Sequence, residues 1–371
     1  MWRVRTAQGD IFTAGARVSA MGPLSRPVFP AIPGTEHFQG KAFHSSQWDH
    51  SYDFAGKKVA IIGTGASAVQ FVPQIAPQVQ KLSVFQRTPP WILPKLDLAH
   101  ADWVLWMLRT IPASKRIARS LLYWCQEAIC IGLVRPSLMR PLEWLARTYL
   151  SRKITDPRLR RALTPSYAMG CKRILLPNDY YDAFARENVE LVTDRIAEIG
   201  SQSIVTEDRI ERAFDAIIFG TGFRGTDLLS PLCVIGRNGA DLSDVWRSGA
   251  EAFLGMTVPG FPNFFMLVGP NTFLAHNSVV FMIEAQVHYV SKALEWLRKN
   301  GKSVMDLRSE AQANFSNDLR KRTKGTTWAS GCTSWYLNER GKNVSLWPGS
   351  SARYWLRTRK FSPADYLFSS T

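Results

Sequence analysis

Residues 38 to 70 read FQGKAFHSSQWDHSYDFAGKKVAIIGTGASAVQ, and the second half of this stretch decides the fold. An apolar, β-branched run at 58 to 62 leads into Gly-x-Gly-x-x-Ala at 63 to 68, and then into residues that suit a helix. A strand, a glycine turn and a helix in this order predict a dinucleotide-binding unit. A second apolar run at 81 to 85 supplies the next strand, which a chance glycine turn would lack. We therefore expect an α/β fold.

Each small residue of the turn has a physical role. Gly63 permits the tight bend, Gly65 lets the backbone approach a pyrophosphate, and Ala68 lets the helix pack closely on the strand. The phosphates would then lie at the positive N-terminus of the helix. The predicted cofactor-binding turn comprises Gly63, Thr64, Gly65, Ala66, Ser67 and Ala68.

The end of the second strand indicates which dinucleotide binds. An NAD-binding unit usually carries Asp or Glu there for the ribose 2′-hydroxyl, whereas this chain has Gln86, Arg87 and Thr88. A cation and a hydroxyl suit a 2′-phosphate, so Arg87 and Thr88 favour NADP(H). The alternative for Arg87 alone is a solvated loop charge.

The composition limits the classes of protein to which the chain can belong. The chain has 371 residues, of which 46% are hydrophobic, so it can bury a large core and divide into two or three compact units. Its formal net charge of +16 comes from scattered basic residues. This pattern favours phosphorylated cofactors or an anionic surface over nucleic acid. No secretory signal is evident, so a cytoplasmic location is the default expectation.

Cysteine spacing and apolar runs disfavour other classes. The cysteines form no Cys-x-x-Cys pair and no metal-ligand spacing, so we expect neither a disulfide framework nor a metal site. The longest apolar run, 121 to 134, contains Glu127 and is shorter than the ~20 residues of a membrane span. We expect a buried helix there, with contact to a membrane surface as the alternative. The cysteines are Cys125, Cys130, Cys171, Cys233 and Cys332.

Two helical regions are predicted beyond the first unit. Residues 102 to 161 read as several helices, and Trp103 and Trp106, with Met107 and Ile111, recur at helical spacing and predict a buried amphipathic face. A longer helix is predicted from 278 to 299, with Asn277 as its cap and Gly301 after its basic end. The positive N-terminus of this helix suits an anionic group.

A spaced series of residues upstream of the glycine turn has no explanation in periodicity. The series Phe-x-Gly-x-x-x-His-x-x-x-Trp-Asp consists of Phe38, Gly40, His44, Trp48 and Asp49. Just before Gly-x-Gly-x-x-Ala, it resembles the fingerprint of type I Baeyer–Villiger monooxygenases, in the flavin-containing monooxygenase superfamily. Related N-hydroxylating and flavin-containing monooxygenases look similar but normally lack the Trp-Asp ending.

The resemblance implies a two-dinucleotide-binding-domain flavoprotein. Such an enzyme uses FAD, NADP(H) and O2 to insert oxygen beside a ketone carbonyl, giving an ester or lactone. The resemblance implies that Lys172 neutralises the 2′-phosphate beside Arg87, and that His44 and Trp48 couple the position of NADP to domain rotation. It gives Arg173 the catalytic role of stabilising a peroxide and a tetrahedral oxyanion, which suits a permanently charged side chain with paired donors. Taken alone, Arg173 would be a structural ion-pair partner.

Four further residues receive roles from the resemblance. Gly222 belongs to Gly-Thr-Gly at 220 to 222, which resembles the second domain crossover, a hinge near the cofactors. Asn271 and Asn277 belong to a Gly-Pro-Asn-Thr…His-Asn-Ser segment that resembles the one facing the flavin ring. Trp335 resembles a residue of the terminal segment that lines the substrate and NADP pockets, with ordinary packing as the alternative.

The resemblance also divides the chain. Residues 1–53 correspond to a remnant of the FAD domain and the fingerprint linker, and 54–225 to the NADP-binding domain with a helical insertion at about 92–165. Residues 226–371 correspond to the returning part of the FAD domain and the C-terminal segment.

Residues 2 to 20 suit two or three strands. They leave no room before them for the βαβ unit, of roughly 30 or more residues, that holds the ADP part of FAD. We therefore expect a chain that lacks this unit. The alternatives are a non-catalytic NADP-binding remnant, an N- or S-oxygenating enzyme and, disfavoured by the cysteine spacing, a disulfide reductase.

Overall fold

The computed structural model describes residues 1–95, 97, 101–331 and 333–370. The chain forms two compact units, each with its own core. Unit 1 comprises Met1–Ser25, His100–Leu138 and Arg224–Thr371, and unit 2 comprises Arg26–Ala99 and Met139–Phe223. The chain passes between the units after residue 25, after residue 223, close to the crossover expected at Gly222, and twice more within the helical insertion. This division differs from the expected one, because residues 26–53 belong to unit 2 and residues 100–138 of the insertion belong to unit 1.

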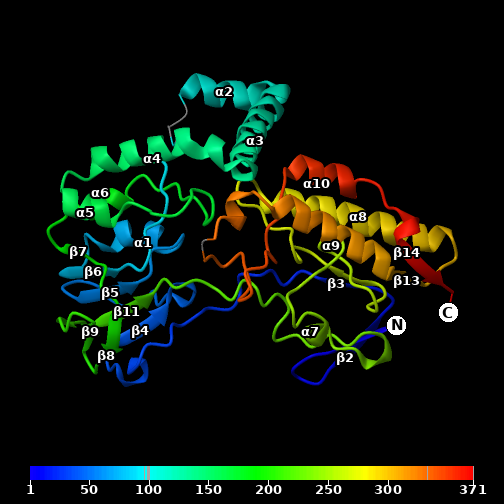
Figure 1. Ribbon diagram of the computed structural model, residues 1–371, viewed down its shortest axis with the longest axis horizontal. Coiled ribbons are helices and arrows are strands. Elements are labelled where there is room, and N and C mark those ends of the chain that lie inside the picture. The colour runs from blue at the N-terminus through cyan, green and yellow to red at the C-terminus, as the bar shows by residue number, and fades with distance from the viewer. Residues whose placement is uncertain (96, 98–100, 332, 371) are drawn as a thin grey trace. The chain divides into compact units, whose positions relative to one another are not determined.

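Unit 2 is built around a five-stranded parallel sheet in the order β4-β11-β5-β6-β7 (Figure 1). The strands are β4 (Lys41–His44), β5 (Lys58–Ile62), β6 (Lys81–Phe85), β7 (Val189–Val192) and β11 (Ala216–Phe219). Each of β5, β6 and β11 buries four successive residues, as expected of central strands covered on both faces. Helix α1 (Ala68–Ile75) follows the glycine turn and packs Val69 and Val72 into the core. The predicted strand, turn, helix and second strand are therefore confirmed.

Helices and a small sheet complete unit 2. Leu150 of α4 and Tyr180 of α6 share one core cluster with Val72 of α1. Ile199 and Ile204 of a three-stranded antiparallel sheet, β10-β9-β8, pack in a second cluster with residues of the parallel sheet. The remaining elements are η1 (Thr35–His37), η2 (Ser45–Gln47), α4 (Arg140–Lys153), α5 (Pro157–Ala162), α6 (Tyr180–Ala183), β8 (Ile196–Ile199), β9 (Ser203–Thr206) and β10 (Glu211–Ala213).

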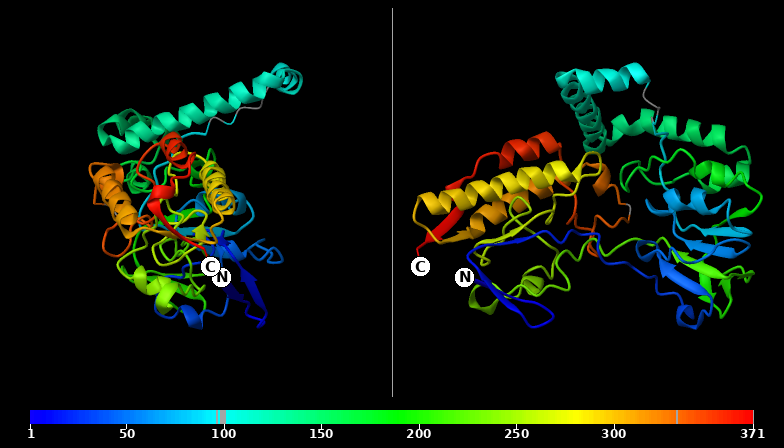
Figure 2. Two further views of the ribbon diagram at one scale, coloured as in Figure 1. Left: turned by 90° about the vertical axis from the view of Figure 1, so that its right-hand side faces the viewer. Right: turned by 180° about the vertical axis from the view of Figure 1, so that it is seen from behind.

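Unit 1 consists of helices over short strand pairs. Helices α8 (Val279–Lys299) and α10 (Ser351–Thr358) pack side by side (Figure 2), and α9 (Ser309–Thr323) buries its apolar face in the same cluster. The described strands pair as β1 with β2, β3 with β12, and β13 with β14. These strands are β1 (Trp2–Arg5), β2 (Ile11–Ala14), β3 (Arg17–Ser19), β12 (Phe264–Met266), β13 (Val304–Leu307) and β14 (Tyr366–Ser369). The other elements are α2 (Asp102–Thr110), α3 (Pro112–Val134), η3 (Pro136–Met139), η4 (Arg237–Gly239), α7 (Leu242–Val245), η5 (Thr327–Ala329) and η6 (Pro363–Asp365).

The buried face predicted for residues 103 to 111 is wrong. Helix α2 has no buried residue, and the side chains of Trp103 and Trp106 are 68% and 63% exposed. The reason is that α3, against which α2 packs, covers only part of its surface. The strands predicted between residues 2 and 20 are confirmed as β1, β2 and β3.

Two smaller expectations also fail. Helix α8 begins at Val279 with Ser278 as N-cap, and the predicted cap Asn277 instead accepts a hydrogen bond from the Ser278 N–H at 2.8 Å. The absence of disulfides was expected from the cysteine spacing, yet Cys171 is disulfide-bonded. Spacing along the chain does not show which thiols the fold brings together. Cys125, Cys130 and Cys233 carry free thiols, and Cys332 lies outside the described residues.

Candidate functional site

The glycine turn of unit 2 has the shape that a pyrophosphate requires. Gly63 has φ +108°, and a Cβ there would come within 2.5 Å of the Gly220 carbonyl oxygen, so only glycine fits. A Cβ on Gly65 would meet no atom within 4 Å, so the outer side of the turn is open. Ala68 is fully buried and lies close to Gly220, where a larger side chain would clash. The turn is therefore tight on its inner side and accessible on its outer side.

The rest of the turn leaves hydrogen-bond donors available to an anion. The Thr64 hydroxyl donates to the Thr88 carbonyl at 3.2 Å, which ties the turn to the loop after β6. Ser67 is the N-cap of α1, but its side chain makes no capping hydrogen bond. Ala66 is exposed. The N–H groups of Val69 and Gln70 donate to the Gly65 and Ser67 carbonyls at 3.1 and 3.0 Å. The N–H of Ala68, at the start of α1 beside the open face of Gly65, remains suited to a phosphate.

Two cations lie together beyond the end of β6. Arg87 is exposed and follows Gln86, which is anchored by its amide donating to the Ala162 carbonyl at 2.9 Å. Lys172 is half-buried, with its Nζ 4.9 Å from the centre of the Tyr167 ring. Burial, followed by the charge of Arg87, lowers the pKa of Lys172. No carboxylate among the described residues pairs with either cation, so a bound phosphate would relieve their repulsion.

Arg173 directly follows Lys172 in the chain. Its side chain is exposed and makes no hydrogen bond or ion pair with the described residues. The described part of the structure therefore gives no support to the alternative of a structural ion pair. A free guanidinium next to the cation pair is available to bind an anion or a developing oxyanion.

The first half of the fingerprint shapes the backbone next to the sheet. A Cβ on Gly40 would come within 2.5 Å of the Asp215 carbonyl oxygen and within 2.7 Å of the Phe38 ring. Phe38 is half-buried and packs against the cluster that contains Ile199 and Phe219. Gly40 therefore lets β4 enter the sheet beside β11, which explains these two residues without a ligand.

His44 lies at the carboxyl end of β4, opposite Phe219 of β11. It is fully buried, with the rings of Phe29 and Phe223 at 5.6 and 5.5 Å. Its Nδ1 accepts the Ser46 N–H at 3.1 Å, which leaves the proton on Nε2. Burial lowers the pKa of His44, and a weaker interaction with the Gly222 backbone partly offsets this. That interaction falls short of good hydrogen-bond geometry, so Nε2 is buried without a full partner.

Gly222 sits where the two crossover segments meet in unit 2. It has φ +81°, and its carbonyl accepts the Val28 N–H at 2.9 Å. The Thr221 hydroxyl donates to the Val28 carbonyl, and Pro27 pairs with Phe223. A neutral, buried His44 beside this pairing suits a role in positioning the crossover better than a role as acid or base.

Trp48 and Asp49 have structural partners. The Trp48 ring packs 5.4 Å from Phe43 of β4 and 5.3 Å from Phe71 of α1, so it joins the sheet to the helix. Asp49 accepts from the Ser51 N–H at 2.9 Å and pairs with Lys41 at 2.5 Å. Hydrogen bonds from Lys41 and Ser51 lower the pKa of Asp49.

The side-chain amide of Asn271, in unit 1, is hydrogen-bonded within the protein. Its φ is +56°, and its Nδ2 donates to the carbonyls of Asn343 and Leu346 at 2.9 and 3.3 Å. The side chain is buried, so it holds the 271–274 loop against the C-terminal segment. The backbone N–H of Asn271 also donates to the Val344 carbonyl at 3.0 Å, so neither its amide Nδ2 nor its main-chain N–H is available to a ligand.

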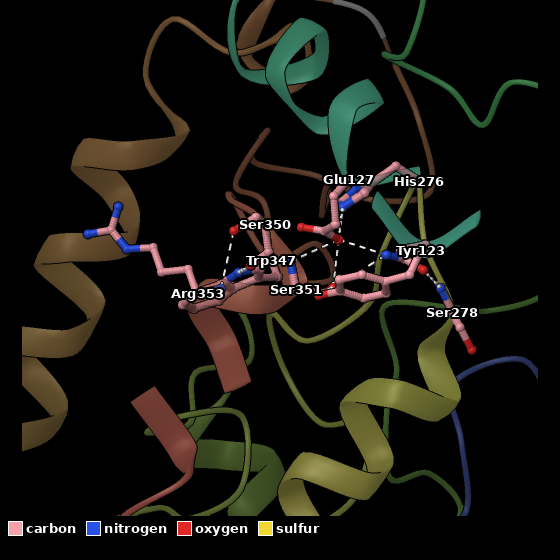
Figure 3. Close-up of polar contacts among 9 residues, drawn as sticks. Tyr123, Glu127, His276, Ser278, Trp347, Ser350, Ser351 and Arg353 are labelled. Carbon is pink, nitrogen blue, oxygen red and sulfur yellow. Dashed lines mark hydrogen bonds and ion pairs between the residues drawn. The ribbon is translucent and has the colours of Figure 1, made fainter. Parts of the chain in front are cut away.

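Asn277 belongs to a buried polar network that the sequence did not reveal. Figure 3 shows Glu127, His276 and Ser351 of this network. One carboxylate oxygen of Glu127, on α3, accepts from Asn277 Nδ2 at 2.7 Å and from the Ser351 hydroxyl at 2.6 Å. The same oxygen lies 3.2 Å from His276 Nε2, and the Tyr123 hydroxyl lies 3.0 Å from Ser351 Oγ. The network joins α3 to the turn before α8 and to the start of α10. Its only sequence signal was an acid within an apolar helical run.

The electrostatics of this network keep Glu127 ionised. Burial would raise its pKa, but hydrogen bonds from His276, Ser351 and Asn277 outweigh burial and lower the pKa to about 2. The other Glu127 oxygen and His276 Nδ1 are buried without partners among the described residues. Ser278, the N-cap of α8, makes no side-chain capping bond. The α8 N-terminus therefore keeps backbone donors that no Ser278 side-chain bond caps, and the Glu127 network holds the turn that precedes it.

Trp335 packs in unit 1. Its ring centre lies 5.3 Å from that of Phe273 and 4.5 Å from that of Tyr336. A Cβ on Gly225 would come within 2.7 Å of the indole. Ordinary packing thus accounts for one face of Trp335, whose side chain remains partly exposed. Among the described residues, no group of three or more His, Cys, Asp or Glu could hold a metal ion.

The sequence matches the family described as flavin-binding monooxygenase-like over residues 7–227. It is 44% identical over 374 residues to a Baeyer-Villiger monooxygenase of Pseudomonas aeruginosa, covering 100% of this chain and 71% of the relative. A Baeyer-Villiger monooxygenase of Streptomyces coelicolor is 42% identical over 368 residues, covering 98% of this chain and 71% of the relative.

Solved structures show the same relationship. An oxidised steroid monooxygenase bound to NADP matches with a TM-score of 0.87 and 28% identity, covering 100% of this chain and 78% of that chain. A cyclohexanone monooxygenase of Rhodococcus bound to NADP+, 24% identical, shares the fold with a TM-score of 0.87 over 100% of this chain and 78% of that one. The chain therefore belongs to the flavin-binding monooxygenase-like family and, within it, to the flavin-dependent Baeyer–Villiger monooxygenases.

Proposed function

We propose that this chain uses NADPH and FAD to carry out Baeyer–Villiger oxidation of a ketone with O2. The observation that carries the proposal is the pair of unneutralised cations, Arg87 and Lys172, beyond β6. The open face of Gly65 lies in the turn after β5. Thr64 of that turn donates to the Thr88 carbonyl and so links the turn to the Arg87 loop after β6. This set of groups suits a dinucleotide with a 2′-phosphate, because the negative charge of the phosphate would neutralise the two cations.

FAD is proposed from the family and from the α8 N-terminus. The uncapped N–H groups at the start of α8 suit the negative charge of a reduced flavin ring. Asn271 Nδ2 donates to the Asn343 and Leu346 carbonyls and Asn277 Nδ2 to Glu127, so the proposed cofactor contacts of these residues use their other polar atoms. A bound flavin would supply the redox chemistry that joins NADPH to O2.

Arg173 is the proposed catalytic residue. Its exposed, unpaired guanidinium is available to stabilise the oxyanion that develops on the ketone carbonyl. In the overall reaction one atom of O2 enters the bond between the carbonyl carbon and its neighbour. The other atom leaves as water, using the hydride of NADPH and one proton from solvent. His44 and Trp48 are proposed to position the linker, and Trp335 to line the substrate pocket.

Two alternatives remain to be separated from this proposal. Oxygenation of nitrogen or sulfur is the chemistry of related flavin-containing monooxygenases. The roles of Trp48 and Asp49 in packing the fingerprint do not by themselves select a ketone. A non-catalytic NADP-binding protein is the second alternative, and the chain spans 71% of the length of the Pseudomonas relative.

The test supplies the purified chain with FAD, NADPH and isotopically labelled O2, and offers a cyclic ketone, a steroid ketone, an amine and a thioether in parallel. We expect an ester or lactone with one labelled oxygen atom, detected by mass spectrometry. An oxygenated amine or thioether without any ester would select the first alternative. NADPH binding without flavin binding or any oxygenated product would select the second.

A further inference from the structure

Helix α3 presents a continuous apolar face that the described residues do not bury, so the buried helix expected over 121 to 134 is wrong. The face, called here the α3 apolar face, consists of Ile117, Leu121, Trp124, Ala128 and Ile131. These positions recur at intervals of four and three residues, so they lie along one side of the helix. Their larger side chains are between 55% and 62% exposed, and Ala128 is exposed as well.

Helix α2 adds two more large exposed side chains to this part of the chain. Trp103 and Trp106 are one helical turn apart and are 68% and 63% exposed. Ile111, at the turn between the two helices, is 44% exposed. The hairpin of α2 and α3 therefore exposes three tryptophans and several aliphatic side chains, a composition found at membrane interfaces, where the amphipathic indole is favoured.

The charges on the hairpin have one predominant sign. Arg109, Lys115, Arg116 and Arg119 are all exposed. Arg116 lies roughly 100° around the helix from Ile117 and borders the α3 apolar face, whereas Arg119 lies roughly 160° away, toward the opposite side of the helix, and neither interrupts the face. Of the two acidic residues between 102 and 134, Glu127 is buried in the polar network and only Asp102 is exposed. An apolar face bordered by exposed cations complements a bilayer surface with anionic headgroups.

The structure favours lipid over other ways of covering the face. A second copy of the chain would bring the same exposed cations against one another. A transmembrane span would fit the 23-residue length and apolar composition of α3. However, the C-terminal half of α3 is held to the rest of unit 1 by the polar network at Glu127 and by the hydrogen bond from the Thr327 hydroxyl to the Leu133 carbonyl at 3.1 Å. The free part of the hairpin is left to lie in the plane of the interface.

We propose that the α2–α3 hairpin binds the surface of membranes that contain anionic lipids. The indoles and the α3 apolar face enter the boundary between headgroups and acyl chains, Arg116 contacts lipid phosphates beside the face, and the other exposed cations of the hairpin add electrostatic attraction to the anionic surface. This inference is independent of the catalytic proposal, because it uses no residue of the cofactor sites.

The test measures partitioning of the full chain onto vesicles by flotation, using phosphatidylcholine alone and phosphatidylcholine with about 30% phosphatidylglycerol. We expect binding to the anionic vesicles that weakens as salt rises. Arg116→Gln with Arg119→Gln should reduce the partition coefficient on anionic vesicles by roughly twentyfold. The triple change Ile117→Ser, Leu121→Ser and Trp124→Ser should reduce it by at least about a hundredfold. Phe12→Ser, which removes a 60% exposed side chain of β2, is the matched control and should change nothing.

A fluorescent thiol label reports where the contact lies. Cys125, beside the α3 apolar face, and Cys233 both carry exposed free thiols. A polarity-sensitive label should shift to the blue on anionic vesicles in the wild type and in Cys233→Ser, and the shift should be lost in Cys125→Ser. The proposal is overturned if the wild type does not float with anionic vesicles, or if the arginine and triple variants bind as the wild type does. A dimer that dissociates in the triple variant, together with no vesicle binding by the wild type, would also overturn it.

Discussion

Replacing Arg87 by alanine should separate NADPH from NADH. Arg87 and Lys172 lie close enough beyond β6 for the charge of Arg87 to lower the pKa of Lys172, and neither has a carboxylate partner among the described residues. NADH lacks the 2′-phosphate, so its affinity should not depend on this pair. Arg87→Ala should therefore weaken NADPH binding and leave NADH binding unchanged.

The magnitude follows from the exposure and the neighbour of Arg87. A hydrogen bond between charged partners contributes about 1.5–3 kcal/mol, and the lower half of that range applies because Arg87 is exposed. Loss of Arg87 also removes a charge that lowers the pKa of Lys172, so Lys172 keeps its proton to higher pH. We expect a loss in NADPH affinity of roughly ten- to thirtyfold at neutral pH.

The pH dependence gives the same experiment a second readout. Lys172 carries its charge below its lowered pKa and loses it as pH rises, so the preference for NADPH over NADH should decline with rising pH. In Arg87→Ala that decline should move to higher pH. Dissociation constants measured by calorimetry, without turnover, test both effects. Arg195→Ala removes a comparable exposed arginine and serves as the control. Equal losses for the two nucleotides in Arg87→Ala would refute the 2′-phosphate site.

Three further predictions concern the turn, the catalytic arginine and the buried network. Gly63→Ala should lower the free energy of unfolding by about 2 kcal/mol or more in a denaturant titration, because φ is +108° and the Gly220 carbonyl is too close. Gly65→Ala should leave that free energy unchanged and weaken the binding of NADPH and NADH alike, as measured by calorimetry. Arg173→Ala should reduce ester formation by at least roughly a hundredfold without altering the NADPH dissociation constant, and normal product yield would remove its role. Hydrogen bonds, which outweigh burial, lower the pKa of Glu127 from 4.5 to about 2, so the wild type should lose about 3 kcal/mol of unfolding free energy as pH falls through that interval. Glu127→Gln should lack this part of the loss in denaturant titrations at pH 5 and below.

Local sequence signals predicted the core of unit 2. The strands at 58–62 and 81–85 appear with the predicted bounds, because continuous apolar runs between turns leave a parallel sheet as the natural arrangement. Gly63 and Ala68 act through sterics with Gly220, a residue about 150 positions away that the motif alone did not identify. Steric motifs of this kind are predictable, since one residue type fits regardless of its partner.

Signals that depend on distant partners were predicted less well. The spacing of Trp103 and Trp106 gives an amphipathic face but does not show whether anything covers it, and the structure leaves it exposed. Asn277 was expected to cap α8, yet its amide bonds to Glu127, which lies 150 residues earlier in the chain. The disulfide of Cys171 likewise depends on the fold and not on local spacing.

The absorbance spectrum of the purified chain, recorded after FAD is supplied and again after NADPH is added in air, tests the proposed function most directly. We expect a bound flavin spectrum that bleaches with NADPH and returns as O2 is consumed, with a weaker response in Arg87→Ala at limiting NADPH. A colourless protein that binds NADPH, or a bound flavin that NADPH does not bleach, would contradict the proposed coupling of NADPH to FAD and O2.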